Sequence, residues 1–96
     1  MEKILSCIAN GNSMSPEIES GDKITIHTTC NSYNVGDIIL FEINNKKILH
    51  RIVCIFLCAS NTYYITKGDF LLDDDTELIV STQIIGKAIH VKHFEK

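Results

Sequence analysis

The sequence predicts a mainly β fold, a small and partly closed β-barrel built from one chain of 96 residues. Helical periodicity is nearly absent, whereas apolar and β-branched runs of strand length recur along the whole chain. Five glycines and one proline punctuate these runs without forming a linker, a repeat or a low-complexity tract. A chain of this length typically forms one domain, and we expect residues 1–96 to be that domain.

Six runs are expected to be strands, and they follow one another along the chain with short connections. They are Ile4–Ala9, Lys23–Thr28, Asp37–Ile43, Lys46–Leu57, Tyr63–Thr66 and Ile84–His93. Asn44 and Asn45 lie between two of these runs and predict a tight hairpin turn, because asparagine tolerates a left-handed backbone. Ser15–Ser20 is the exception, since Pro16 near its start is compatible with one helical turn.

Composition and charge exclude several classes of function. The net charge of −3 offers no basic surface for nucleic acid, so we expect no nucleic-acid partner. No apolar run reaches the ~20 residues that span a bilayer, and the first residues do not resemble a secretory signal. We therefore expect a cytoplasmic protein with no membrane anchor in this chain. A longer, anchored protein from which this domain was separated stays an alternative.

Four cysteines, at positions 7, 30, 54 and 58, are expected to be free thiols. A disulfide framework would be typical only of a secreted protein. No pair of cysteines has CxxC spacing, and no histidine lies at zinc-finger distance, so the sequence indicates no metal and no cofactor. Cys54 and Cys58 belong to the apolar run IVCIFLC. We expect them to be small, buried residues on one face of a strand.

The first segment that could carry chemistry is the turn at residues 11–16, Gly-Asn-Ser-Met-Ser-Pro. Ser13 stands there just after the end of a predicted strand. Such a turn exposes a hydroxyl and directs backbone N–H groups outward, as an acyl-transfer nucleophile and its oxyanion require. Clusters of this composition are more often simple loops, so the turn alone does not establish catalysis.

The second segment is the apolar run at residues 48–53, which His50 interrupts. Most such histidines are structural, but an imidazole is also the usual base for a serine. Because side chains alternate along a strand, Arg51 should face the other way and anchor a loop or reach solvent. The remaining histidines, at positions 27, 90 and 93, are expected at the surface or at strand edges.

The third segment is acidic, with Asp69 in Lys-Gly-Asp followed by aspartates at positions 73, 74 and 75. The simplest interpretation is a solvated loop. A calcium loop is disfavoured, because the segment lacks the mid-loop glycine and the closing glutamate of such loops. A third interpretation uses one carboxylate to orient His50, as the acidic member of a catalytic triad does.

Taken together, these segments resemble the signal peptidase I family and its LexA/signal peptidase-like fold. Between Asn10 and Lys87 the chain carries, in order, Ser-Met-x-Pro, Gly-Asp, Val-Gly-Asp-Ile-Ile, His-Arg-Ile-Val, Lys-Gly-Asp…Asp and Ile-Gly-Lys. The resemblance is closest to the branch of archaea, spore-formers and the endoplasmic reticulum, which uses serine and histidine. Other branches use serine and lysine. The family fold is compact, mostly β and barrel-like.

Carried over by position, the resemblance implies four site residues. Ser13 matches the nucleophile and His50 the general base. Asp75 matches the acid that orients the base, and Asp69 matches a second aspartate with a structural role. The resemblance implies a serine endopeptidase that cleaves a peptide or a leader of a precursor protein. We expect its substrate to lie extended along an exposed strand edge.

The chain departs from the family pattern in three places. Only about ten residues precede the serine segment, where the family normally has a transmembrane helix. Phe70 and Leu71 replace the two asparagines that usually follow Lys-Gly-Asp. Gly11 replaces a serine that assists the oxyanion hole in many relatives, which leaves the backbone N–H of Ser13 as the main donor, with Asn12 as a helper. These departures keep open a second hypothesis, a non-catalytic peptide-binding or regulatory domain with the same fold.

Overall fold

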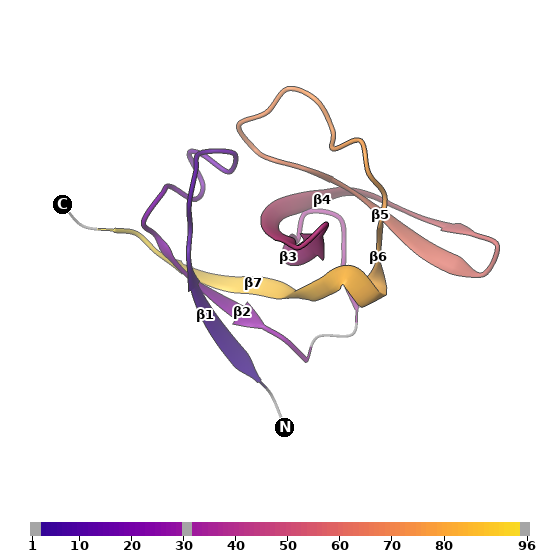
Figure 1. The fold of residues 1–96 in the computed structure, drawn as a ribbon, viewed down its shortest axis with the longest axis horizontal. Helices are drawn as coiled ribbons and strands as arrows, with labels where there is room; N and C mark the ends of the chain where they lie inside the picture. Colours follow the sequence, from indigo (N-terminus) through magenta and orange to yellow (C-terminus); the bar gives the residue numbers. More distant parts are fainter. Residues whose placement is uncertain (1–2, 30–31, 95–96) are drawn as a thin grey trace.

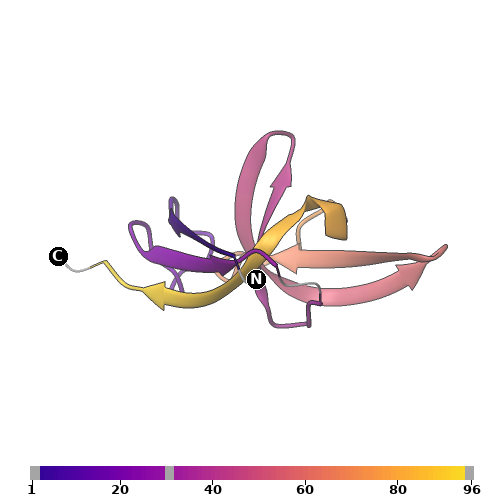
Figure 2. The same ribbon diagram turned by 90° about the horizontal axis from the view of Figure 1, so that it is seen from below.

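The computed structural model describes residues 3–29 and 32–94, and within them seven strands form one antiparallel sheet. The sheet has the order β1-β2-β7-β3-β4-β5-β6. A short 3-10 helix, η1 (Ser81–Gln83), directly precedes β7, the last strand along the chain. The strands are β1 (Ile4–Ile8), β2 (Lys23–His27), β3 (Ile38–Ile43), β4 (Lys46–Cys58), β5 (Asn61–Lys67), β6 (Ile79–Val80) and β7 (Ile84–Lys92). The sheet curls without closing (Figures 1 and 2), which confirms the prediction of a mainly β, partly closed fold.

Strand β7 joins the two halves of the sheet. Its C-terminal part pairs with β2 and its N-terminal part with β3, so that β1 and β2 lie toward one end and β3–β6 toward the other (Figure 1). Gly86 lies where β7 passes β2. A Cβ atom there would lie 2.6 Å from the carbonyl oxygen of His27 and 2.6 Å from a methyl group of Ile26. The close approach of the two strands therefore requires glycine at this position.

Strand β3 is buried on both faces and separates two apolar clusters. Ile38 and Leu40 belong to the first cluster, whereas Ile39 and Phe41 belong to the second. This division follows from the alternation of side chains along a strand. The first cluster also contains Met14, Ile18, Ile24 and Ile26, and the second contains Ile52, Tyr64 and Ile79. Burial of each such side chain is worth roughly 1.5–3 kcal/mol.

Two hairpins have two-residue turns with a left-handed backbone. Asn44 and Asn45 have φ angles of 52° and 66°, which confirms the predicted turn between β3 and β4. Ala59 and Ser60, between β4 and β5, have φ angles of 50° and 69°. The Ser15–Ser20 segment forms turns rather than a helix, with one helix-type hydrogen bond from the Ile18 N–H to the Met14 carbonyl (2.9 Å).

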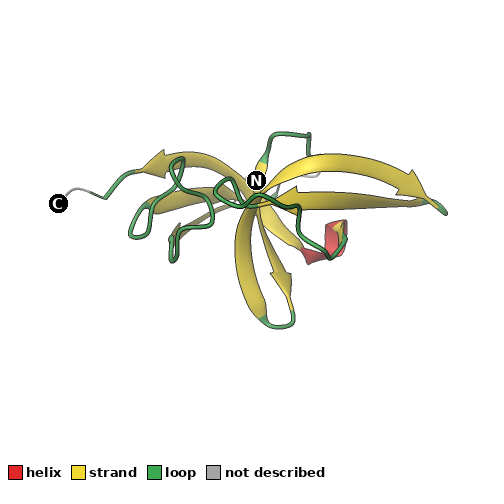
Figure 3. Cartoon of the chain, turned by 90° about the horizontal axis from the view of Figure 1, so that it is seen from above, coloured by secondary structure: helices red, strands yellow, loops and turns green. Residues whose placement is uncertain are grey.

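Strand β4 contains a bulge that reverses its faces. Its pairing with β5 passes from Ile52 to Cys54, so that Val53 is the extra residue. One extra residue moves the following side chains to the opposite face, and Ile55 packs on the second cluster in place of Cys54. Cys54 and Cys58 are therefore exposed, and the prediction that they are buried is wrong. Both belong to β4, and the β4–β5 hairpin projects from the rest of the sheet (Figures 1 and 3).

The thiols of Cys7, Cys54 and Cys58 are free, as expected, and Cys30 lies outside the described residues. Cys7 is half-buried, and its burial raises the pKa of the thiol. Within residues 3–29 and 32–94, no helix is long and apolar enough to cross a membrane.

Candidate active site

Ser13 lies in the connection between β1 and β2, which two neighbouring residues fix to the core. Met14 and Ile18 are 4% and 2% exposed and pack in the first apolar cluster. The base of the connection is closed by two backbone hydrogen bonds, from Ala9 to Asp22 (2.8 Å) and from Gly21 to Ala9 (2.9 Å). Ser13 itself stays half-buried at the surface of this anchored turn.

Asp22 ties the end of the same connection to the C-terminal segment. Its carboxylate is 2% exposed and accepts hydrogen bonds from the backbone N–H groups of Glu19 (2.9 Å) and Phe94 (2.8 Å). His93 Nδ1 lies 2.8 Å from the same carboxylate. The hydrogen bond from Glu19 and that from Phe94 lower the pKa of Asp22. His90 and His93 are at the surface, as expected, and His27 is half-buried on β2 beside Thr29.

Strand β4 presents His50 to the connection between β1 and β2, residues 9–22, which we call the serine turn. The Nε2 atom of His50 lies 3.1 Å from the Oγ atom of Ser13. In the β3–β4 pairing His50 is opposite Ile39, so its ring shares the face of the second apolar cluster and packs edge-on against Phe41. The imidazole is 10% exposed. An apolar strand thus holds one polar ring at the edge of the core, directed at a surface hydroxyl.

Asp75 binds the other ring nitrogen of His50. Its Oδ2 atom lies 2.6 Å from Nδ1. An ionised carboxylate only accepts hydrogen bonds, so we assign a proton to Nδ1; in the neutral imidazole this leaves the lone pair of Nε2 directed at the Ser13 hydroxyl. The structure therefore brings Ser13, His50 and Asp75 into one hydrogen-bonded chain.

Thr66 also binds Asp75, and the sequence analysis missed this residue. Its hydroxyl donates to the same Oδ2 atom (2.7 Å), and its carbonyl accepts the backbone N–H of Asp75 (2.8 Å). Thr66 is fully buried on β5. The available signal was a hydroxyl side chain at the end of the predicted strand Tyr63–Thr66, directly before Lys67-Gly68-Asp69.

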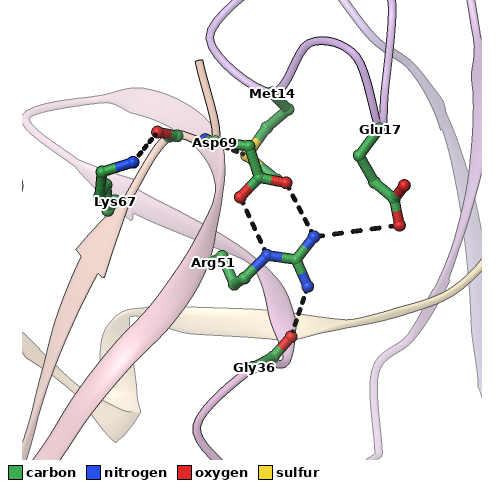
Figure 4. A network of polar contacts seen from close by, with 7 residues as sticks. Met14, Glu17, Gly36, Arg51, Lys67 and Asp69 are labelled. Carbon is green, nitrogen blue, oxygen red and sulfur yellow. Dashed lines mark hydrogen bonds and ion pairs between the residues drawn. The ribbon is translucent and has the colours of Figure 1, made fainter. Parts of the chain in front are cut away.

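Arg51 faces away from His50, as strand alternation predicts, and binds Asp69 with two hydrogen bonds (Figure 4). The Nε–Oδ1 and Nη2–Oδ2 distances are 2.9 and 2.8 Å. Arg51 also donates to the carbonyl of Gly36 (2.7 Å) and lies 3.9 Å from a carboxylate oxygen of Glu17 in the serine turn. The hydrogen bonds between Arg51 and Asp69 lower the pKa of Asp69 and raise the pKa of Arg51. Asp69 thus joins β4 to the neighbouring loops and is not the hydrogen-bond partner of His50.

The loop after β5 packs against the serine turn and is hydrogen-bonded to it. The Phe70 N–H donates to the carbonyl of Ser13 (2.9 Å), and the Asp69 N–H contacts the sulfur of Met14 (3.4 Å). A Cβ atom on Gly68 would lie 2.6 Å from the Ser13 carbonyl oxygen and 3.0 Å from His50 Nε2. Only glycine allows the loop to approach the serine and the histidine so closely.

A pocket of about 530 Å³ adjoins Ser13 and His50. Its wall is mostly apolar and comes from the end of β1, the serine turn, the β3–β4 hairpin and Leu71. Lys47 reaches the same pocket. Mostly apolar walls with a few polar groups at one end are typical of ligand sites.

The acidic loop does not form a metal site in the described part of the chain. No group of three or more His, Cys, Asp or Glu residues could hold a metal ion there. Asp69 is bound to Arg51 and Asp75 to His50, whereas Asp73 and Asp74 are exposed. The carboxylates that a calcium loop would gather on one ion are therefore directed to different partners.

Comparison with known proteins identifies the family. Residues 2–89 match the family described as Peptidase S24-like. The signal peptidase complex catalytic subunit SEC11 of Chaetomium globosum is 35% identical over 75 residues, covering 74% of this chain and 44% of the relative. The same subunit of Candida albicans is 32% identical and that of Candida tropicalis 33% identical, over 84% of this chain and 55% of each relative. The chain thus spans about half the length of these curated relatives.

These relatives overturn one expectation and support another. The cytoplasmic location expected from the sequence is wrong, because the relatives are named catalytic subunits of the signal peptidase complex. The resemblance drawn from the serine, histidine and Lys-Gly-Asp segments is confirmed, since the family match covers nearly the whole chain. The chain therefore belongs to the Peptidase S24-like family and is similar to catalytic subunits of the signal peptidase complex.

Proposed function

We propose that this chain is a serine endopeptidase in which Ser13 is the nucleophile, His50 the general base and Asp75 the residue that orients the base. The observation that carries the proposal is the hydrogen-bonded chain from Ser13 Oγ through His50 to Asp75, with distances of 3.1 and 2.6 Å. Nucleophile, base and orienting acid are arranged as acyl transfer by a serine requires. Membership of a peptidase family supports the same assignment.

The mechanism follows from the donors and acceptors of this chain. As Ser13 Oγ attacks the scissile carbonyl, its proton passes to His50 Nε2, and Asp75 stabilises the imidazolium that forms. His50 then gives this proton to the leaving amine. A water molecule, deprotonated by the same imidazole, releases the acyl group from Ser13. The backbone N–H of Ser13 is assigned to the oxyanion, with the Asn12 amide as a helper.

Asp69 is assigned a positioning role. It binds Arg51 on the face of β4 opposite to His50, and the residue after it binds the Ser13 carbonyl. The ion pair therefore holds the loop that carries Asp75 against the serine turn. Asp69 acts on the reaction through this loop and does not exchange a proton with substrate.

The substrate is assigned as an extended peptide, such as the leader or signal sequence of a precursor protein. Within the described sheet β1 is an edge strand, paired only with β2, and it leads directly into the serine turn. An unpaired strand edge offers backbone donors and acceptors to an added strand. The relatives are named signal peptidase subunits, which supports a precursor as the substrate class.

Cleavage of synthetic precursor peptides, followed by mass spectrometry, tests the proposal. We expect Ser13→Ala to abolish cleavage without unfolding the chain, because a half-buried turn serine contributes little packing. Ser15→Ala is the matched control, since Ser15 lies in the same turn and its hydroxyl bonds to Glu19 rather than to His50. Peptide binding without cleavage by the wild-type chain would favour the non-catalytic alternative.

A further inference from the structure

The loop after Gly68 carries three exposed apolar residues at the edge of the candidate active site. Phe70, Leu71 and Leu72 are 59%, 41% and 96% exposed. The family resemblance leads us to expect asparagines at the first two of these positions. Of the three residues, only Leu71 lines the pocket that adjoins Ser13 and His50.

Leu71 is held at the reacting end of this pocket. Its N–H donates to the carbonyl of Gly68 (3.0 Å), and the preceding N–H, of Phe70, donates to the carbonyl of Ser13 (2.9 Å). One methyl carbon of Leu71 and the Nε2 atom of His50 lie 3.1 and 3.0 Å from the point where a Cβ atom on Gly68 would stand. The leucine methyl carbon and the imidazole nitrogen therefore lie at most 6.1 Å apart.

Other parts of the pocket lining are aliphatic too. They include Met14, Ile18, Leu40 and Leu49, which belong to the first apolar cluster or pack against it. Because Ser13 lines the same pocket, a substrate residue whose carbonyl approaches Ser13 can place its side chain against Leu71 and these aliphatic residues. Asparagine at position 71 would instead present an amide that needs a polar partner.

We propose that Leu71 is a specificity-determining residue that selects an aliphatic substrate side chain next to the scissile bond. The inference rests on the proposed function, because it takes Ser13 as the point of attack. It goes beyond that function by assigning the substrate preference to a residue of this chain that departs from the family pattern. An apolar pocket already discriminates by roughly 10-fold or more between substrates that differ by one methylene.

Selection from a random peptide library tests the inference without requiring turnover. The Ser13→Ala chain, immobilised, is compared with the same chain carrying Leu71→Asn or, as a matched control, Leu72→Asn. We expect the Ser13→Ala chain to enrich peptides with an aliphatic residue at one position over polar residues of similar shape, such as Leu over Asn and Val over Thr. Leu71→Asn should reduce this enrichment about 10-fold. Leu72→Asn should leave it unchanged, because Leu72 does not line the pocket.

Three outcomes would overturn the inference: no aliphatic enrichment by the Ser13→Ala chain, an unchanged enrichment in the Leu71→Asn chain, or an equal loss in both asparagine variants. Circular dichroism verifies that each variant is folded, which we expect because both leucines are exposed. The same library incubated with the chain that retains Ser13 tests cleavage separately. Selective binding without cleavage would reject the proposed peptidase activity but retain Leu71 as a residue that selects the bound peptide. Cleavage together with an unchanged Leu71→Asn profile would retain the peptidase activity and reject the role of Leu71.

Discussion

His50 and Arg51 are neighbours on β4, yet they bind two aspartates of the same loop on opposite faces of the strand. His50 meets Asp75 on the face that looks toward Ser13, and Arg51 meets Asp69 on the other face. The first pair is directed at a hydroxyl, whereas the second joins the loop to β4 and lies near Glu17 of the serine turn. Strand alternation therefore directs two adjacent residues to opposite faces, one toward the proposed nucleophile and the other toward the supporting loop.

The largest effect is expected from His50→Ala. Removal of the base of a serine triad lowers kcat by several orders of magnitude, up to about 10⁶-fold. Lys47→Ala is the control for a lysine base, since Lys47 lines the same pocket. It should retain most activity, as should Lys46→Ala. Measured kcat values for these variants would contradict the assignment if a lysine variant were inactive and the His50 variant active.

Asp75→Asn should have the next largest effect on cleavage. An asparagine can donate to Nδ1, which favours the wrong tautomer of His50, and the analogous change in serine proteases lowers kcat about 10⁴-fold. Asp69→Asn should lower kcat much less, because Asp69 binds Arg51 instead of His50. Equal losses of kcat in the two variants would show that the division between the two aspartates is wrong.

Asp69→Asn should act mainly on stability, lowering the free energy of unfolding by about 1–2 kcal/mol, since it weakens a charge-assisted pair. The pKa of Asp69 is lowered, chiefly by its hydrogen bonds with Arg51. Its contribution is therefore present above the unfolded carboxyl pKa of about 4 and is lost as the pH falls through the lower folded value. Urea unfolding between pH 7 and pH 3 should show a smaller difference between wild type and variant at the acidic end. A difference that does not change with pH would contradict this account.

The smallest effect is expected from Cys54→Ser, which tests the bulge at Val53. An exposed substitution should change the free energy of unfolding by less than about 0.5 kcal/mol. Ile52→Ala, on the buried side of the bulge, should lower it by about 2–5 kcal/mol. Thermal melting of both variants measures the contrast. Destabilisation by Cys54→Ser comparable to that by Ile52→Ala would mean that β4 continues without a bulge.

Local rules of sequence predicted much of the fold and part of the candidate site. The positions of all strands except the short β6 follow from apolar and β-branched runs, and the β3–β4 turn follows from the left-handed preference of asparagine. The opposite directions of His50 and Arg51 follow from alternation along one strand. Each of these features depends on residues that are close together in the chain, so the sequence alone determines them.

Only the tertiary structure decided the features that depend on pairing between distant segments. The choice between Asp69 and Asp75 as the partner of His50 depends on how the loop after β5 packs against the serine turn. The exposure of Cys54 depends on the register between β4 and β5, which one unpaired residue shifts. Thr66 meets Asp75 because the loop after β5 folds back on the end of that strand, and no local pattern of residues indicates how a loop folds.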